Sequence, residues 1–414
     1  MKIQNIFYEI KRILCLLLLA VLLTAVVEPV SVAAESTSIG SESSANLAVD
    51  NSVNESLNQL ISWFDKQDTL NPYEADSSVS DWVTFCMGRL GRADETASYR
   101  KALHSYVEEA YRKPELLDAT RATEWHRISL TFAANGEMPS IDFLADGTFY
   151  RGYTTPLNAQ GVNGCIWALI TLDAMDCPLP EDAYDTRESM IKTILSYHKD
   201  GSGFMLTSPE DAVESCDIDI TANAITALAP YYLGERELSS EELSPAITSA
   251  VEDGLAFLSE NQLDDGSFLK PDSKESASSE SCSQVLIALT ALHIDPENDS
   301  CFLKNGHSVL DALMQFQNED GGFAHVAGDE SNLIASSQAT EALCAYKLYQ
   351  EQGISLYDLT DTVSAPTLPD GMTHENYRKE NSSRTTLFLA AAGGILIVGG
   401  VVVITIFVSK KRKN

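Results

Sequence analysis

The chain has 414 residues, and its 60 acidic residues against 28 basic ones give a formal net charge of −32 at pH 7. A surface this acidic repels nucleic acid and anionic lipid headgroups, so we expect no nucleic-acid partner. The eight cysteines are scattered without any Cys-x-x-Cys pair, which excludes a disulfide scaffold but leaves one or two disulfides open in an exported protein.

The first 34 residues have the three parts of a secretory signal peptide. Basic residues at the front precede an apolar run over residues 13–27, and Val32-Ala33-Ala34 forms a small-residue cleavage site. Residues 35–54 are rich in Ser, Glu, Ala and Asn, which predicts a disordered leader. We therefore expect the rest of the chain to be secreted.

Residues 55–350 carry a helical pattern that recurs about six times. Each copy has a variable first residue and then, four and five residues on, a small and a large apolar residue. The first residues are Trp82, Trp125, Gly164, Asn223, Gln284 and Gln338. Asp-Gly turns followed by Phe separate some copies, and the Phe would pin the turn to a neighbouring helix. Two helices per unit predict an all-α repeat architecture in which each helix pair needs its neighbours to bury its apolar face.

The C-terminal part is expected to be a stalk and a membrane anchor. Residues 351–384 contain Pro and Gly clusters and few apolar residues, which predicts a stalk. Residues 385–408 carry no charge and are long enough to cross a ~30 Å hydrocarbon core as a transmembrane helix. The basic tail, 409–414, would stay in the cytoplasm. We expect a single-pass cell-membrane protein that contacts the lipid bilayer through residues 385–408, with its ectodomain outside the cell.

Two motifs resemble those of squalene and terpene cyclases. Gln262-x3-Gly266-x-Phe268 and Gln317-x3-Gly321-x-Phe323 resemble the QW motif, with Phe in place of Trp. Asp217-Ile-Asp219-Ile-Thr221-Ala222 resembles the Asp-x-Asp-Asp-Thr-Ala motif of squalene-hopene cyclases. The chain is thus similar to the prenyltransferase and squalene-cyclase repeat superfamily. This resemblance implies a single α/α toroid of six helical hairpins over residues 55–350.

Asp217 and Asp219 leave three interpretations open. Asp219 directly precedes a good helix start at Ile220, so it can be a helix cap, and Asp217 would lie too early to cap the same helix. The resemblance implies instead that Asp219 is a catalytic proton donor assisted by Asp217, which requires a dry pocket that keeps the acid neutral. Ile220 stands where squalene-hopene cyclases have Asp. In the third interpretation the two carboxylates contact a ligand.

Size and predicted location favour binding over catalysis. Triterpene cyclases enclose their substrate between two helical barrels, whereas this chain has residues for one. Ile218-Asp219-Ile220-Thr221-Ala222 is also loosely similar to a helix start in the secreted transcobalamin and intrinsic-factor family, which implies cobalamin as a possible ligand. The Asp-x-Cys…His zinc arrangement of protein prenyltransferases is missing, so we place no metal. We expect a small hydrophobic or corrinoid-like ligand, or a partner, in the toroid cavity, with a terpene-cyclase or prenyltransferase-like enzyme as the alternative.

Six residues are candidates for contacting that ligand. Three are aromatic and three are polar: Trp82, Trp125, Trp167, Asn223, Gln284 and Gln338. Aromatic residues at helical spacing belong more often to a core than to a pocket. The three polar residues occupy one register of the repeat, and in a toroid they would surround one end of the cavity.

Overall fold

The computed structural model describes the backbone of residues 39–378 with short gaps, and side chains from residue 52 onward. The gaps are residues 72–74, 76, 112–116, 118–119, 208–214 and 270–275. The chain divides into two compact units, residues 1–49 and 50–414, and the architecture below is that of the second unit. In the described residues the secondary structure is helical, with isolated β-bridges in the connections and no strand.

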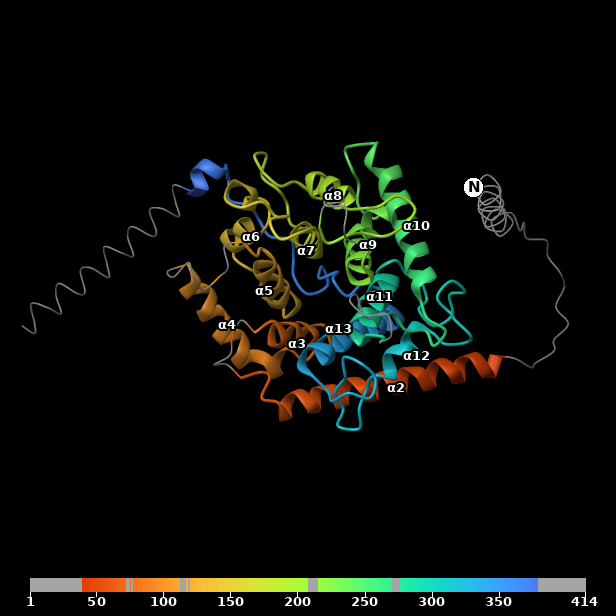
Figure 1. The fold of residues 1–414 in the computed structure, drawn as a ribbon. Coiled ribbons are helices and arrows are strands. Elements are labelled where there is room, and N and C mark those ends of the chain that lie inside the picture. Colours follow the sequence, from red (N-terminus) through yellow and green to blue (C-terminus); the bar gives the residue numbers. More distant parts are fainter. Residues whose placement is uncertain are drawn as a thin grey trace, which may run out of the picture. The chain divides into compact units, whose positions relative to one another are not determined.

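The described helices alternate between two sets (Figure 1). The first set is α3 (Ser78–Arg89), α5 (Thr123–Ala134), α7 (Asn163–Ala174), α9 (Ile218–Tyr232), α11 (Ser279–Ala291) and α13 (Leu333–Gln352). The second set is α2 (Ile39–Lys66), α4 (Ala97–Ala110), α6 (Ile141–Gly147), α8 (Arg187–Ser196), α10 (Leu243–Asn261) and α12 (Val309–Met314). Two 3-10 turns, η2 (Ala93–Thr96) and η3 (Arg151–Tyr153), lie in connections.

The first set forms a closed ring. Each of its helices contacts the next one in chain order, and α13 contacts α3. Helices α6, α8, α10 and α12 each pack on the ring helix that precedes them in the chain. This arrangement is the all-α toroid of helix pairs that the repeating pattern predicts.

Sequence explains which helices form the ring. Helix α7 (NGCIWALITLDA) is apolar on nearly all sides and buried along most of its length, and α11 is buried almost throughout. A helix that is hydrophobic all round must be surrounded by other elements. By contrast, α8 and α10 bury only one face. Helices α7 and α11 are therefore inside the ring because neither has a broad polar face to expose.

The Gln-x3-Gly-x-Phe segments fasten turns to neighbouring repeats. Gln262 Nε2 donates to the carbonyl oxygens of Gly266 (3.0 Å) and Phe302 (2.9 Å), and Phe268 is fully buried. Gly266 has φ +83°, and a Cβ there would lie 2.5 Å from the Ser308 carbonyl oxygen. Only glycine fits such a position, because the backbone is left-handed and the next repeat touches it. Phe268 and Phe323 are both fully buried, as their predicted anchoring role requires.

The two ends of the chain differ from the expectation in the part that is described. The backbone is helical from Ile39, inside the range 35–54 expected to be a disordered leader. Residues 353–363, expected to belong to a stalk, pack on the ring, and Leu356, Tyr357 and Leu359 are buried there. The signal peptide (1–34) and transmembrane helix (385–408) lie outside the described residues. Among the helices that are described, none has the length and apolar character of a membrane span.

Candidate functional site

Asp217, rather than Asp219, is the cap of helix α9. Its side chain accepts a hydrogen bond from the Ile220 backbone N–H (2.9 Å), its backbone is extended (φ −113°, ψ 139°), and the helix begins at Ile218. The extended conformation is held because the Asp217 N–H donates to the Phe204 carbonyl oxygen (3.0 Å). The expectation that Asp219 caps the helix and that Asp217 lies too early is therefore wrong by two residues.

Asp219 lies half-buried in the first turn of α9. Its Oδ1 is shielded from solvent and has no hydrogen-bond partner among the described residues. Burial raises the pKa of Asp219 to about 7, and the negative charges of Asp217 and Glu280 add to the rise, while Ser281 and His325 oppose it. A carboxyl group in this environment is largely protonated below neutral pH.

Glu280 and His325 lie near Asp217 and Asp219, and the four side chains form an acidic cluster. Glu280, in the first turn of α11, lies 2.7 Å from His325 Nδ1 and accepts hydrogen bonds from the hydroxyl groups of Ser278 and Ser279 (3.0 and 3.1 Å). The cluster thus lies where the ring helices begin, and it draws on three consecutive repeats. No group of three or more His, Cys, Asp or Glu side chains is arranged to hold a metal in the part of the chain that is described.

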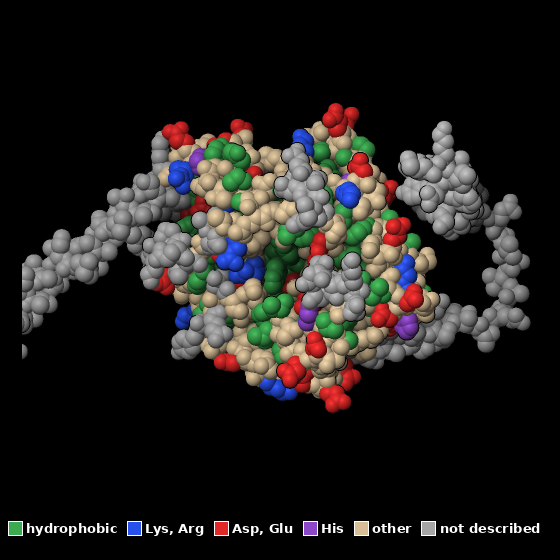
Figure 2. All heavy atoms as spheres, viewed as in Figure 1, with side chains coloured by type: hydrophobic (Ala, Val, Ile, Leu, Met, Phe, Trp, Pro, Cys, Tyr) green, Lys and Arg blue, Asp and Glu red, His purple; other side chains and the backbone are tan. Residues whose placement is uncertain are grey.

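The interior of the ring contains two of the three predicted tryptophans. Trp82 on α3 and Trp167 on α7 are half-buried with ring centroids 5.2 Å apart, and Tyr357 packs edge-on against Trp167 at 5.6 Å. Helix α5 lies between α3 and α7 in the ring, so the two tryptophans meet across the interior. Figure 2 shows a hollow near the centre of this unit, with hydrophobic side chains inside it.

The remaining predicted ligand contacts divide into two groups. Gln284 and Gln338, on α11 and α13, are half-buried and joined by a hydrogen bond (2.9 Å), and Asn223 on α9 is also half-buried. Trp125 lies elsewhere, in a core cluster with Phe143, and its ring is covered by the Arg151 guanidinium group at 4.5 Å. Trp125 is therefore apart from the other two tryptophans, because α5 turns it towards the outer helices.

The opposite end of the ring is covered by the chain itself. The segment 353–363 follows α13 and crosses the ends of the ring helices. Its Leu359 N–H donates to the Ala174 carbonyl oxygen on α7 (2.9 Å), and its Asp361 pairs with Arg89 on α3 (2.6 Å). The Tyr357 hydroxyl group reaches the buried Glu341 of α13 (3.4 Å). The segment therefore closes this end.

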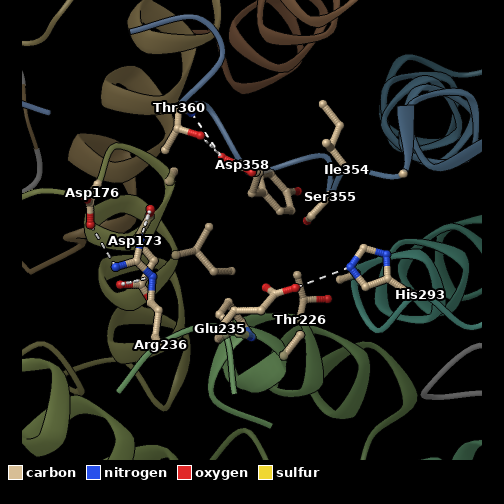
Figure 3. A pocket seen from close by; sticks show the side chains of 18 residues that line it. Asp173, Asp176, Thr226, Glu235, Arg236, His293, Ile354, Ser355, Asp358 and Thr360 are labelled. Atoms are coloured by element: carbon tan, nitrogen blue, oxygen red, sulfur yellow. Dashed lines mark hydrogen bonds and ion pairs between the residues drawn. The ribbon is translucent and has the colours of Figure 1, made fainter. Parts of the chain in front are cut away.

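A cavity of about 480 Å³ remains between this segment and the ends of α7, α9 and α11 (Figure 3). Its polar lining includes Asp173, Glu235, Arg236, His293 and Asp358. His293 Nε2 lies 3.5 Å from Glu235 Oε1. No sequence motif marks this cavity, because its lining comes from helix ends and connections that share no spacing.

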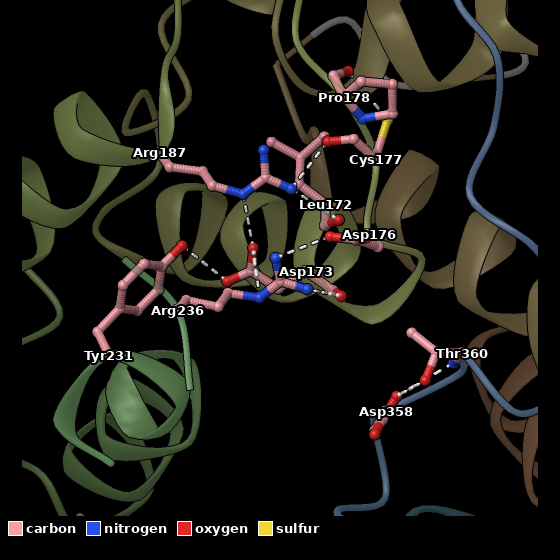
Figure 4. Close-up of polar contacts among 10 residues, drawn as sticks. All are labelled: Leu172, Asp173, Asp176, Cys177, Pro178, Arg187, Tyr231, Arg236, Asp358 and Thr360. Atoms are coloured by element: carbon pink, nitrogen blue, oxygen red, sulfur yellow. Dashed lines mark hydrogen bonds and ion pairs between the residues drawn. The ribbon is translucent and has the colours of Figure 1, made fainter. Parts of the chain in front are cut away.

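Asp173 organises one wall of the cavity (Figure 4). Its Oδ1 lies 2.7 Å from Arg187 Nε and 3.4 Å from Arg236 Nε, and its Oδ2 accepts a hydrogen bond from the Tyr231 hydroxyl group (2.9 Å). Arg236 also pairs with Asp176 (3.0 Å). Both guanidinium groups are thus matched by carboxylates, and the arrangement is that of a structural network that joins α7, α8 and α9.

A comparison with protein families decides the classification. The model of the prenyltransferase alpha-alpha toroid domain matches residues 146–332 and 270–401. The chain belongs to this toroid family. No curated protein matches the sequence.

Membership in the toroid family agrees with the closed ring and with the two Gln-x3-Gly-x-Phe turns, which lie inside the matched residues. The match does not reach α3 and α5, which carry Trp82 and Trp125. The likeness to transcobalamin stays a prediction.

Proposed function

We propose that the protein binds a small, largely apolar molecule in the interior of its toroid. The observation that supports this most directly is the pair Trp82 and Trp167, which meet across the ring and remain half-buried. Ligand sites are concave, mostly apolar and often lined by aromatic side chains. Tyr357 closes the interior on one side, so a ligand would enter from the end where the ring helices begin.

The polar side chains of the interior would orient the ligand. The amide groups of Gln284 and Gln338 are paired with each other, and a ligand hydroxyl, carbonyl or amide group could replace one partner. Asn223 lies on α9, the ring helix that contacts α11. A few polar groups in an apolar site are the usual source of orientation and specificity. Isoprenoid alcohols and corrinoids such as cobalamin both combine apolar surface with such groups.

Tryptophan fluorescence tests this proposal with matched variants. The chain has four tryptophans, of which Trp63 and Trp125 are buried away from the Trp82–Trp167 pair. Farnesol, used as the isoprenoid probe, should change the emission of the wild-type protein saturably. The double variant Trp82→Phe/Trp167→Phe should lose this response, whereas Trp63→Phe/Trp125→Phe should keep it. Equal responses of the two double variants would place the probe outside the ring interior and refute the proposal. Cyanocobalamin is tested in parallel by co-elution of its visible absorption.

A second candidate function, acid catalysis, is favoured by the Asp219 carboxyl group. Its Oδ1 is shielded from solvent and has no hydrogen-bond partner among the described residues, and burial raises its pKa to about 7. A proton donor for an alkene needs a neutral acid in a dry site. Mass analysis of squalene and farnesyl diphosphate after incubation with the protein tests this function. Turnover that is abolished by Asp219→Asn would support it, and unchanged substrate with the wild-type protein would exclude it for these substrates.

We also propose that the toroid is held outside the cell by residues 385–408. The support is the sequence alone: a signal-like segment at the front, a charge-free run near the end and a basic tail. Protease added to intact cells should remove the toroid, while a tag placed after Asn414 should stay protected. A tag that the protease digests in intact cells would overturn this orientation.

A further inference from the structure

Another cavity lies beside α5, between the end of α4 and the turn η3 that follows α6. Its volume is about 360 Å³, at the lower end of the ~300–1,000 Å³ range of small-molecule sites. Apolar and aromatic side chains supply part of its lining: Ala110, Tyr111, Leu117 and Trp125. We call this cavity the outer pocket. It shares no lining residue with the cavity under the segment 353–363, so the two are separate.

Trp125 forms a rigid wall of the outer pocket. Only 8% of it is exposed, and its ring lies against Phe143 with the ring centroids 6.2 Å apart. Gly147 of α6 packs on it so closely that a Cβ at this glycine would lie 2.6 Å from Trp125 Cβ. A side chain that is already fixed loses little conformational freedom when a ligand binds, which favours affinity.

Two arginines bring positive charge to the outer pocket. Arg151, in η3, is 4% exposed, and its guanidinium carbon lies 4.5 Å from the centroid of the Trp125 ring. Arg378 also lines the pocket and is exposed. In the part of the lining that the structure describes, these two cations face one carboxyl group, that of Asp146. The described lining is therefore net positive by one charge, in a chain whose net charge is −32.

A small carboxylate fits this combination of charge and apolar surface. A guanidinium group can donate two parallel hydrogen bonds to one carboxylate, and the single excess positive charge matches a monoanion better than a doubly charged phosphate. We propose that the outer pocket binds a monocarboxylate with an apolar body. The carboxylate would pair with Arg151 and Arg378, and the body would lie against Leu117 and Trp125. This inference does not rest on the ligand proposed for the ring interior.

Equilibrium dialysis of the full-length protein tests the proposal with 3-phenylpropionate as the probe. The acid should bind saturably. 3-Phenylpropanamide, which has the same body without the charge, should bind at least about tenfold more weakly, because hydrogen bonds to a charged group are stronger than those to a neutral one. No saturable binding of the acid at millimolar concentrations, or equal affinities for the acid and the amide, would overturn the proposal.

A pair of charge variants tests whether the acid reaches this pocket. Arg378→Gln should weaken binding of 3-phenylpropionate about fivefold, because the carboxylate loses one charged donor. Arg378 is exposed, so the variant should fold. Lys101→Gln is the matched control, because it removes one positive charge at an exposed position of α4 outside the pocket lining. This control should bind the acid as the wild-type protein does. Equal affinities of the two variants would contradict the proposal.

Tryptophan fluorescence separates the outer pocket from the ring interior. The acid should change the emission of Trp82→Phe/Trp167→Phe, which keeps Trp125 in the pocket lining. It should leave the emission of Trp63→Phe/Trp125→Phe unchanged. This order is the reverse of that expected for farnesol, so either ligand can fail without the other. A response to the acid that is lost in Trp82→Phe/Trp167→Phe and kept in Trp63→Phe/Trp125→Phe would place the acid in the ring interior and refute the outer pocket as its site.

Discussion

The two ends of the ring are chemically different, and the chain treats them differently. Where the ring helices begin, side-chain acceptors meet free backbone N–H groups, as Asp217, Ser278 and Asn332 do at α9, α11 and α13. Where the helices finish, donors meet free carbonyl groups, as Leu359 does at Ala174 and Arg236 at the Asp173 carbonyl oxygen. A helix leaves four unpaired N–H groups at its start and four unpaired C=O groups at its finish. Because the ring helices are parallel, their unpaired N–H groups gather at one end of the ring and their unpaired C=O groups at the other.

This difference explains why one end is closed and the other carries the candidate site. The segment 353–363 brings N–H groups, hydroxyl groups and Tyr357 to the carbonyl end and fills it. At α9, α11 and α13 the N–H end is satisfied by short side chains that each cap a single helix. The helix dipole also favours negative charge at this end, where Asp217 and Glu280 lie in the first turns or at the caps. Asp219 shares that end, but Oδ1 of its carboxyl group is shielded from solvent.

The largest expected effect comes from removing the cover of the closed end. Tyr357→Ala should lower the free energy of unfolding by about 3 to 5 kcal/mol, because a buried aromatic ring leaves a cavity against Trp82 and Trp167. Urea unfolding measures this change. Ile334→Ala, at an exposed position of α13, is the control and should cost no more than about 0.5 kcal/mol. Equal losses for the two variants would show that the segment does not stabilise the ring.

A smaller and pH-dependent effect is expected at the open end. Burial raises the folded-state pKa of Asp219 to about 7, so the folded protein holds a proton that the unfolded chain has lost above pH ~4. Stability should therefore fall as pH rises from about 4 to 7. Asp219→Asn should make this fall smaller, while other carboxyl groups such as that of Asp185, whose pKa burial raises to about 6, keep the rest of it. At pH 8 the variant should be more stable than the wild-type protein by about 2 to 4 kcal/mol. Unfolding titrations at pH 4, 6 and 8 measure the difference.

The control for this pH series is Asp200→Asn, since the Asp200 side chain is fully exposed. This variant should follow the wild-type pH dependence. If Asp219→Asn followed it as well, the carboxyl group of Asp219 would be ionised in the folded protein, and the acid interpretation would lose its physical basis.

The smallest effect is expected at the cap of α9. Asp217→Ala should cost about 1 kcal/mol, because the Ile220 N–H loses its acceptor, whereas Asp217→Asn keeps an acceptor and should cost a few tenths at most. Chemical denaturation at pH 8 compares the two variants. An equal loss for both would mean that the charge of Asp217, rather than its hydrogen bond, stabilises the helix start.

The fold could be predicted from the sequence because its signals are local and repeated. The small-then-large apolar pair recurs on the ring helices, and Gln262 with Gly266 and Phe268 forms the same turn as Gln317 with Gly321 and Phe323. The helix start at Asp217 could not be fixed in this way. Both Asp217 and Asp219 are good caps by residue type, and the choice depends on the Phe204 carbonyl oxygen, which lies in another turn.

The closed end and its cavity were not predictable for a similar reason. Leu356, Tyr357 and Leu359 are buried in a segment without helical or strand periodicity, so its composition indicates a stalk. The burial comes from the carbonyl ends of helices far away in the chain. Asp173 likewise looks like any polar residue near the end of a helix, because its partners Arg187 and Arg236 come from later connections.

The path of the segment after residue 363 has a mechanical consequence. The His374 N–H donates to Asp182, and the Tyr377 hydroxyl group donates to the Asp142 carbonyl oxygen on α6. The chain thus passes the ends of α3, α5 and α7 and leaves the ring beside α6. Helix α6 packs on α5, which is the second ring helix after α13. A pulling force applied to the chain beyond residue 378 would act first on the hydrogen bonds of His374 and Tyr377. It would reach the contacts of Tyr357 only after those hydrogen bonds had broken. Peeling from the C-terminus would therefore uncover the closed end before it separates any pair of ring helices.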